Sequence, residues 1–244
     1  MAPVTATGTA HDAGAGTGKV TELDCASLTT REVNEALRRL PAGSKVRIAN
    51  PRGRHNLAVG LMHHLDIEID GHAGYFIGGL CDGPSITVNG FVGWSLAENL
   101  MSGTVRVRGN ASECCGATSH GGTVIVHGDA SSRAGISLKG GELAIGGDVG
   151  HMSGFMAQAG TILVGGDAGH ALGDSLYEAV IYVAGRIASL GSDAQIEDLT
   201  ESDVEKVRSL VELAGFDHIS PENVTRVASA KQLYHFDALR EQKY

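Results

Sequence analysis

GTVRVRG at residues 103–109 returns 19 positions later as GTVIVHG at residues 122–128, and two intervals further on as GTILVGG at residues 160–166. The glycine that closes this phrase recurs seven times at the same 19-residue spacing. These glycines are Gly71, Gly90, Gly109, Gly128, Gly147, Gly166 and Gly185. A fixed period over more than a hundred residues is typical of a solenoid, in which each repeat forms one layer of a stack.

Each repeat carries two aliphatic residues, four and two positions before its closing glycine. The pairs are Ile67/Ile69, Ile86/Val88, Val105/Val107, Val124/Val126, Leu143/Ile145, Ile162/Val164 and Ile181/Val183. This alternation predicts a short strand with both aliphatic side chains on one face. Equivalent strands stacked as a parallel sheet lie about 4.8 Å apart, so the layers would form a rod roughly 30 Å long. Only the stack can bury the pairs, because one layer has no core of its own.

Small residues also recur seven positions after the closing glycines and six positions before them. The first set is Gly78, Ala97, Gly116, Gly135, Gly154, Gly173 and Ser192, and the second is Gly103, Gly122, Gly141, Gly160 and Ala179. We expect the glycines of all three sets to form corners, where a positive φ or a close backbone approach excludes a side chain. At Gly128 a positive φ is the prediction to test.

The sides of the coil, six and seven residues long, are unequal. A left-handed hexapeptide prism has equal sides and a period of about 18 residues, and parallel crossovers are generally right-handed. The leucine and asparagine pattern of leucine-rich repeats is missing. The sequence therefore predicts an all-β solenoid, a right-handed parallel β-helix of about seven 19-residue coils with flanking capping helices.

The composition divides the chain into four segments: a disordered tail at 1–18, an N-terminal capping segment with a helix at 19–45, the parallel β-helix at 46–192, and a helical cap and tail at 193–244. The tail is rich in Gly, Ala and Thr without periodicity, which favours disorder. Val46 alternates with Ile48 but out of phase with the later coils, so we expect an irregular first layer.

Two helices are expected beside the repeat. Thr29 followed by Glu32 fits a capping box ahead of the first helix. Thr200 begins a second helix that runs to Ala214 and ends at Gly215. Because the open ends of a β-helix expose unpaired backbone and apolar side chains, we expect these helices to cap the two ends.

The composition narrows the class of protein. The 244 residues carry a net charge of -9, which disfavours a nucleic-acid-binding surface. No stretch resembles a secretory signal or a membrane span. The cysteines show no framework spacing, so a reducing cytoplasm is expected. They are Cys25, Cys81, Cys114 and Cys115.

Three aspartates form a candidate site, because Asp129, Asp148 and Asp167 each follow a closing glycine and should stack one layer apart. Stacked carboxylates could bind a cation or share protons. The favoured interpretation is structural, with each carboxylate accepting hydrogen bonds from N–H groups of its own Gly-Asp corner. Arg186, in the equivalent place one layer on, would relieve the like charge.

Histidines and cysteines give weaker candidates. His151 and His170 lie one period apart, but the neighbouring layers offer serines, which are poor metal ligands. Cys114-Cys115, with His120 nearby, lacks the ligand spacing of zinc or iron–sulfur sites, so both groups are interpreted as structural. No metal site and no catalytic residue is predicted in this chain.

Arg52 and Arg54 lie in the most polar segment of the chain, just before the regular coils. They could contact an anion or a partner chain. A solvated connection explains them equally well.

The phrases at residues 103–109, 122–128 and 160–166 resemble the Gly-x-Gly-x-Gly β-helix domain at the C-terminal end of the glutamate synthase large subunit. The same domain stands alone as the β-helix subunit of formylmethanofuran dehydrogenase. The resemblance covers roughly residues 20–230. In the glutamate synthase large subunit this domain follows an amidotransferase domain and an FMN-binding domain, whose motifs this chain lacks. That difference resembles split systems such as N-methylglutamate synthase of methylamine-using bacteria.

The resemblance implies a non-catalytic subunit of a glutamate synthase-like complex, most closely N-methylglutamate synthase. Its implied partners are an amidotransferase-like subunit and an FMN-binding subunit, with FMN and an iron–sulfur cluster held by partners and no cofactor in this chain. The alternative is the stand-alone β-helix subunit of a formylmethanofuran dehydrogenase-like formyltransferase/hydrolase complex. A carbohydrate lyase is disfavoured, because Trp94 is the one tryptophan and no export signal is recognisable.

Overall fold

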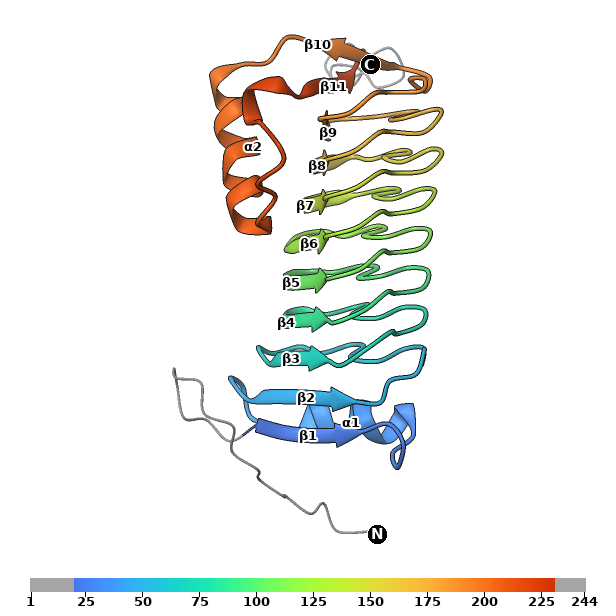
Figure 1. The fold of residues 1–244 in the computed structure, drawn as a ribbon, viewed down its shortest axis with the longest axis vertical. Coiled ribbons are helices and arrows are strands. Elements are labelled where there is room, and N and C mark those ends of the chain that lie inside the picture. Colours follow the sequence, from blue (N-terminus) through green and yellow to red (C-terminus); the bar gives the residue numbers. More distant parts are fainter. Residues whose placement is uncertain (1–19, 231–244) are drawn as a thin grey trace, which may run out of the picture.

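The computed structural model describes residues 20–230 and forms one long stack of strands (Figure 1). The tail predicted at residues 1–18 lies outside the described residues, as does the end of the predicted C-terminal cap. Eleven strands form a single sheet in the order β1-β2-β3-β4-β5-β6-β7-β8-β9-β11-β10. The strands are β1 (Val20–Asp24), β2 (Lys45–Ala49), β3 (Asp66–Ile69), β4 (Asp82–Val88), β5 (Ser102–Val107), β6 (Thr123–Val126), β7 (Lys139–Ile145), β8 (Ala159–Val164), β9 (Val180–Val183), β10 (Ala194–Glu197) and β11 (Thr225–Ser229).

The 19-residue period is confirmed as one coil of a parallel β-helix. From β3 to β9 every neighbouring pair is parallel, and Val105 lies beside Val124, which lies beside Leu143. The register continues from Leu143 to Ile162 and on to Ile181. Successive coils superpose along the rod in Figure 1.

Two aliphatic columns fill the interior. The column that runs from Ile67 to Ile181 is at most 3% exposed, and the column from Ile69 to Val183 is fully buried. Burying one Val or Ile side chain contributes about 1.5–3 kcal/mol. The stack therefore gains its stability along its whole length, as the alternating pattern predicts.

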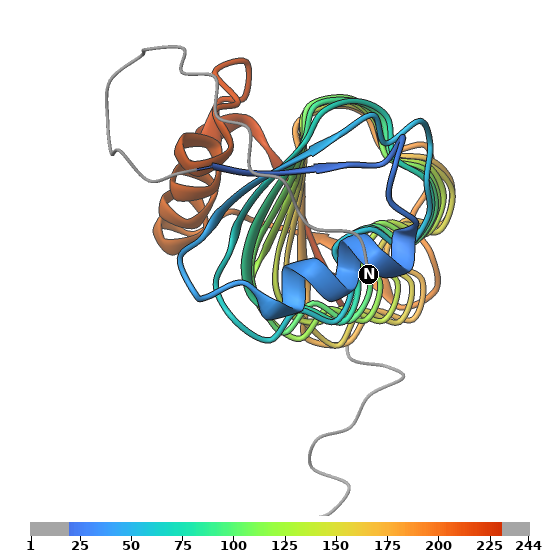
Figure 2. The same cartoon turned by 90° about the horizontal axis from the view of Figure 1, so that it is seen from below.

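The first layers depart from the period, as expected. Val46 of β2 pairs with Ile67 of β3, a separation of 21 residues by number. Strand β1 was not predicted, because only a helix was expected in residues 19–45; β1 pairs with β2 and extends the sheet by one layer. Helix α1 (Thr30–Arg39) has the predicted capping box between Thr29 and Glu32. In the view from below it crosses the end of the rod (Figure 2).

The C-terminal helix corrects one prediction. Helix α2 (Glu201–Ala214) begins after Thr200 and ends at Gly215, whose φ is 74°, but it does not cap the end. It lies along the side of the rod in Figure 1, against the outer face of the sheet. The reason is a change of outward side chains, which are polar at Glu68 and Thr87 but apolar from Ile125 onward and need a cover.

The far end of the rod is closed by strands instead. Strand β11 pairs antiparallel with β9, and β10 pairs antiparallel with β11. A short 3-10 helix, η1 (Pro221–Asn223), precedes β11. Val227 of β11 is fully buried and completes the interior column beyond Ile181.

The glycines of the second and third sets have a positive φ, but the positive φ predicted for Gly128 is wrong. Among the closing glycines only Gly71 has a positive φ. At Gly128 a Cβ atom would lie 1.9 Å from Asn110 Oδ1 and 3.1 Å from the Gly109 carbonyl oxygen. Close approach of the coil below, rather than a left-handed backbone, is what excludes a side chain there.

Positive φ values occur instead in the turn after each closing glycine. Residues 76, 78 and 80 of one coil all have positive φ, and 133, 135 and 137 repeat the pattern three coils later. The middle position faces the interior, so a Cβ at Gly135 would lie 2.6 Å from Ile162 Cδ1. The flanking positions hold residues with side chains, such as Phe76 and Leu80. Their left-handed backbone conformation costs conformational energy.

Candidate interaction surfaces

Within residues 20–230 no group of three or more His, Cys, Asp or Glu side chains could hold a metal ion. Every buried side-chain nitrogen and oxygen in that range has a hydrogen-bond partner. Burial raises the pKa of Cys115 to about 12 and also raises the pKa of Cys114. The vicinal thiols are therefore poor nucleophiles at neutral pH. The candidate functional features of the described residues lie on the outer surfaces of the rod.

The three aspartates stack as predicted, but their hydrogen bonds run between coils. Asp129 Oδ1 accepts from the Asp148 N–H at 2.9 Å, and Asp148 Oδ1 accepts from the Asp167 N–H at 2.6 Å. The prediction that each carboxylate serves its own corner is wrong, because each accepts from the N–H one coil above. Arg186 ends the stack, because its backbone N–H and its guanidinium both donate hydrogen bonds to the Asp167 carboxylate. These hydrogen bonds lower the pKa of Asp167.

This stack is the upper part of a longer column, the side-chain ladder, whose members lie one per coil. They are His72, Phe91, Asn110, Asp129, Asp148, Asp167 and Arg186. His72 Nδ1 accepts from the Phe91 N–H at 3.0 Å, and Asn110 Oδ1 accepts from the Asp129 N–H at 3.1 Å. Phe91 alone among the members below Arg186 has no acceptor atom for the coil above.

Stacked aromatic rings occupy the N-terminal part of the same face. The Tyr75 ring stacks between His55 at 4.3 Å and Trp94 at 5.2 Å, centroid to centroid. The rings of His72 and Phe91 stack at 4.8 Å. We call these five residues the aromatic patch. The sequence carried a signal for it, because Trp94 follows Tyr75, and Phe91 follows His72, by one period.

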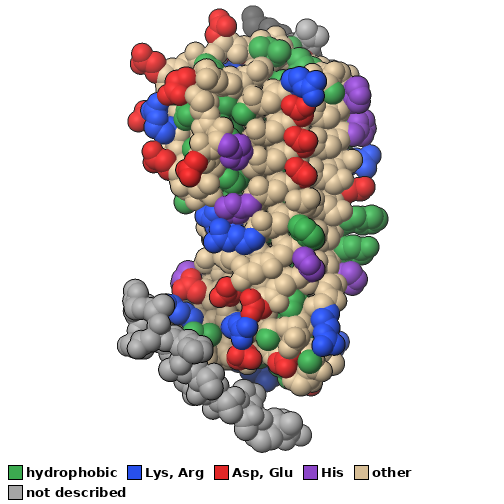
Figure 3. All heavy atoms as spheres, in the orientation of Figure 1, with side chains coloured by type: hydrophobic (Ala, Val, Ile, Leu, Met, Phe, Trp, Pro, Cys, Tyr) green, Lys and Arg blue, Asp and Glu red, His purple; other side chains and the backbone are tan. Residues whose placement is uncertain are grey.

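The aromatic patch is open to solvent. Tyr75 is 46% exposed, Phe91 54% and Trp94 50%. Figure 3 shows hydrophobic side chains protruding from one edge of the rod, and acidic side chains one above another on the adjoining surface. These three are all the Phe, Tyr and Trp residues that are among the exposed large hydrophobic residues of the described chain.

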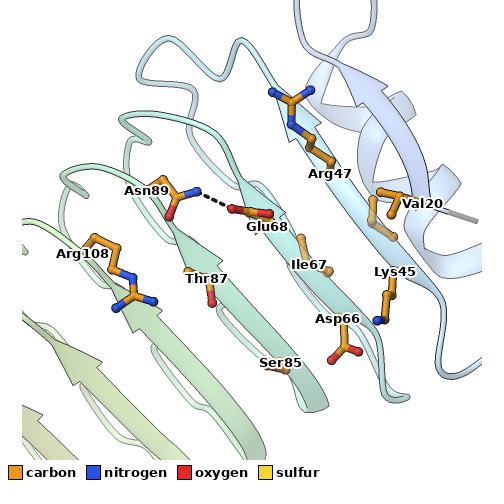
Figure 4. Close-up of a pocket in the computed structure, with 11 residues that line it drawn as sticks. Val20, Lys45, Arg47, Asp66, Ile67, Glu68, Ser85, Thr87, Asn89 and Arg108 are labelled. Atoms are coloured by element: carbon orange, nitrogen blue, oxygen red, sulfur yellow. Dashed lines mark hydrogen bonds between the residues drawn. The ribbon is translucent and has the colours of Figure 1, made fainter. Parts of the chain in front are cut away.

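A second surface is the part of the sheet that α2 leaves uncovered. A shallow hollow of about 520 Å³ lies over β1 to β4 and reaches Arg108, just after β5. Its lining mixes both signs of charge, including Lys45, Arg47, Asp66, Glu68 and Arg108 (Figure 4). Several of these groups are already paired, since Arg47 contacts Asp70 and Glu68 accepts from Asn89. Because these charges are of both signs and already paired, the hollow does not indicate one class of ligand.

The boundary between the hollow and α2 is set by Arg106. Its guanidinium donates to the carbonyl oxygens of Ala214 and Leu213 at 3.0 and 2.9 Å. The last carbonyl groups of a helix have no partner within the helix, so a cation that binds them stabilises the helix end. Next to it, burial and the charges of Arg108 and Arg106 lower the pKa of His127.

The other end of α2 is held by Asp203. Its carboxylate accepts hydrogen bonds from Thr200, from the Tyr182 hydroxyl and from Arg226 Nε. Burial alone would raise the pKa of Asp203, but these hydrogen bonds outweigh it and the pKa falls to about 2. One carboxylate thus joins α2, β9 and β11.

The remaining predicted residues border the aromatic patch or continue its columns. Arg54 donates to the carbonyl oxygens of Leu28 and Cys25, which ties the first turn to the N-terminal layer. Arg52 is exposed, and its role as a partner or anion contact stays a prediction. His151 and His170 lie on successive coils, as expected.

No helix within residues 20–230 is long and apolar enough to cross a membrane. No protein-family model matches the chain. A curated relative, protein GlxC of Rhizobium meliloti (strain 1021), is 46% identical over 218 residues. The alignment covers 88% of this chain and 96% of the relative, so the similarity spans nearly the whole of both proteins. The chain belongs to the family of protein GlxC.

Proposed function

We propose that this chain is a non-catalytic assembly subunit of a glutamate synthase-like complex, most closely N-methylglutamate synthase. The observation that carries the proposal is the filled interior of the coils. Two aliphatic columns occupy the axis from β3 to β9, and the described residues hold no cluster of metal-ligating side chains. Within residues 20–230, the outer faces are therefore the surfaces open to a partner.

The resemblance of the coils to the Gly-x-Gly-x-Gly domain supports the choice of complex. The partners are an amidotransferase-like subunit and an FMN-binding subunit, which supply ammonia-transfer and redox chemistry. The rod supplies a rigid spacer with separate surfaces. Solenoid stacks suit this role because each coil is fixed by its neighbours and the sides are long and regular.

The test is to purify the chain alone and after co-expression with its neighbouring gene products. We expect the isolated chain to show no flavin absorbance and no turnover of glutamate or methylamine. The co-expressed complex should contain both partners and flavin. Flavin bound by the isolated chain, or co-purification with a formyltransferase and an amidohydrolase-like subunit instead, would refute the proposal.

A further inference from the structure

Phe91 lacks the side-chain hydrogen bond to the next coil that the other members of the side-chain ladder below Arg186 make. His72, Asn110 and the aspartates above them each offer an acceptor to the N–H one coil above. A phenyl ring at that place offers none to the Asn110 N–H. Phe91 is also 54% exposed, so it gains little from burial. Backbone hydrogen bonding alone would favour Asn or Asp at this position.

The exposure of Phe91 is shared by its neighbours. Tyr75 and Trp94, in the adjacent column, are about half exposed and stack on one another. Single exposed apolar residues are common, but a contiguous aromatic cluster marks an interaction site. Because His55 and Trp94 cover both faces of the Tyr75 ring, that ring is not an open platform for a sugar. Contact through ring edges fits a protein surface.

Three carboxylates lie on the C-terminal side of the patch, and the exposed Arg133 lies near one of them, Glu113. Glu113 follows Trp94 in one column, and Asp129 and Asp148 follow Asn110 in the other. Asp129 and Asp148 each use Oδ1 within the ladder and point exposed carboxylates outward. In the described chain neither has an ion-pair partner. A surface with aromatic and acidic sections side by side complements arginine, which binds both aromatic rings and carboxylates.

We infer that the aromatic patch, with Glu113, Asp129 and Asp148, is the docking face for an arginine-bearing surface of one partner subunit. The partner's identity rests on the proposed function; the face itself rests on exposure and charge. Aromatic side chains and arginine are the residue types most enriched at the centres of interfaces. On this face Phe91 and Trp94 form the centre and the aspartates the polar rim.

The ladder provides a variant that separates folding from docking. Phe91→Asn restores an acceptor like that of Asn110, so the melting temperature should stay level or rise. Affinity for the partner should fall at least about tenfold, as for a central interface residue. Leu213→Ala, which removes an exposed apolar side chain on α2, is the matched control and should leave affinity unchanged.

A second variant tests the charge. Asp129→Asn/Asp148→Asn keeps both ladder acceptors and removes two negative charges. We expect unchanged stability, weaker binding at low salt, and a flatter dependence of affinity on ionic strength. Equal salt dependence in wild type and variant would exclude an arginine-bearing partner surface.

Trp94 gives a direct readout, because it is the only tryptophan of the chain. The chain is labelled with 5-fluorotryptophan and its single ¹⁹F signal is followed as each unlabelled partner subunit is added. The signal should shift and lose its solvent-isotope effect on binding. A complex that leaves Trp94 solvent-exposed and tolerates Phe91→Asn would overturn the docking face but not the proposed function.

Two other outcomes are decisive. If neither subunit binds, the proposed function fails and the inference fails with it. If the chain alone forms dimers that Phe91→Asn dissociates, measured by sedimentation velocity, the face joins two copies of this chain and the inference is wrong.

Discussion

At the scale of single residues, glycine is required wherever a side chain from the coil below crosses the backbone. A Cβ at Gly147 would lie 2.1 Å from Asp129 Oδ1, and the same geometry recurs at Gly166 with Asp148. The carboxylate lies across the glycine to reach the next N–H. The glycine and the aspartate of the recurring Gly-Asp pair therefore depend on each other, because each glycine leaves space for the aspartate side chain of the coil below.

Gly147→Ala should therefore lower the free energy of unfolding by about 1–3 kcal/mol, because it displaces the Asp129 carboxylate from its hydrogen bond. In an Asp129→Ala background the same change should cost less, since the clashing oxygen is gone. Urea unfolding of the four proteins in this double-mutant cycle measures the difference. Strict additivity would contradict the crossing-carboxylate explanation.

The sequence shows which positions are glycine, but not always which constraint excludes a side chain there. Periodicity alone cannot separate a positive φ from a close approach, because both exclude a Cβ. It also missed the left-handed residues on either side of Gly135, since Arg133 and Ser137 carry no compositional signal for positive φ. Ile162 Cδ1, which would lie 2.6 Å from a Cβ at Gly135, makes that position strict, whereas Ala97 fits at the equivalent inward place in another coil.

Gly135→Ala should destabilise the fold by about 1–2 kcal/mol from the left-handed backbone, and further because Ile162 must move. Ala97→Gly, at the equivalent position, is the matched control and should change stability much less. Thermal unfolding of both variants makes the comparison. Equal effects would mean that the inward clash is unimportant.

At the scale of elements, the start of α1 and both ends of α2 were predicted correctly, but α2 was misplaced. Its capping box and terminal glycine are local signals, which the sequence shows directly. Its docking on the sheet depends on outward residues of β6 to β9, namely Ile125, Ala144, Leu163 and Tyr182. These apolar residues recur at 19-residue intervals in the sequence. Only the stacked structure shows that they form one continuous outer surface that needs a cover. The strands β10 and β11 were missed because they lie outside the repeat.

The attachment of α2 should weaken in acid. The folded pKa of Asp203, about 2, lies below its ordinary value of 3.8, so the ionised form is favoured by folding. This contribution is complete above about pH 4 and is lost as the pH falls toward 2. Hydrogen exchange of α2 peptides, corrected for intrinsic rates, should rise in that window. Asp203→Asn should already exchange faster at pH 6, and unchanged exchange would contradict the anchor.

The cation at the C-terminal end of α2 gives a complementary prediction. Arg106→Met keeps much of the side-chain volume but loses both hydrogen bonds to the Ala214 and Leu213 carbonyl oxygens. We expect faster exchange in the last turn of α2 and little change in β3 or β8. Arg108→Met, two residues along the chain and without such contacts to α2, is the control. Faster exchange throughout the rod would show that Arg106 supports the coils instead.

At the scale of the whole molecule, the rod follows from one rule: a residue and the residue 19 positions later occupy the same place on successive coils. The rule was readable from the sequence, and it also placed the side-chain ladder and the aromatic patch. What it could not supply is which columns are covered, because exposure depends on where α2 and the end strands lie. Helix α2 covers the outward side chains of β6 to β9 and leaves the aromatic patch open.

The register itself can be tested in solution with paired cysteines and dibromobimane, which bridges thiols a few ångströms apart. Glu68 and Thr87 are outward neighbours on successive coils, and Arg47 lies one layer below Glu68. The pair Glu68→Cys/Thr87→Cys should become fluorescent through an intramolecular bridge, whereas Arg47→Cys/Thr87→Cys, two layers apart and roughly 10 Å from each other, should not. Bridging of the second pair in preference to the first would contradict a coil of 19 residues.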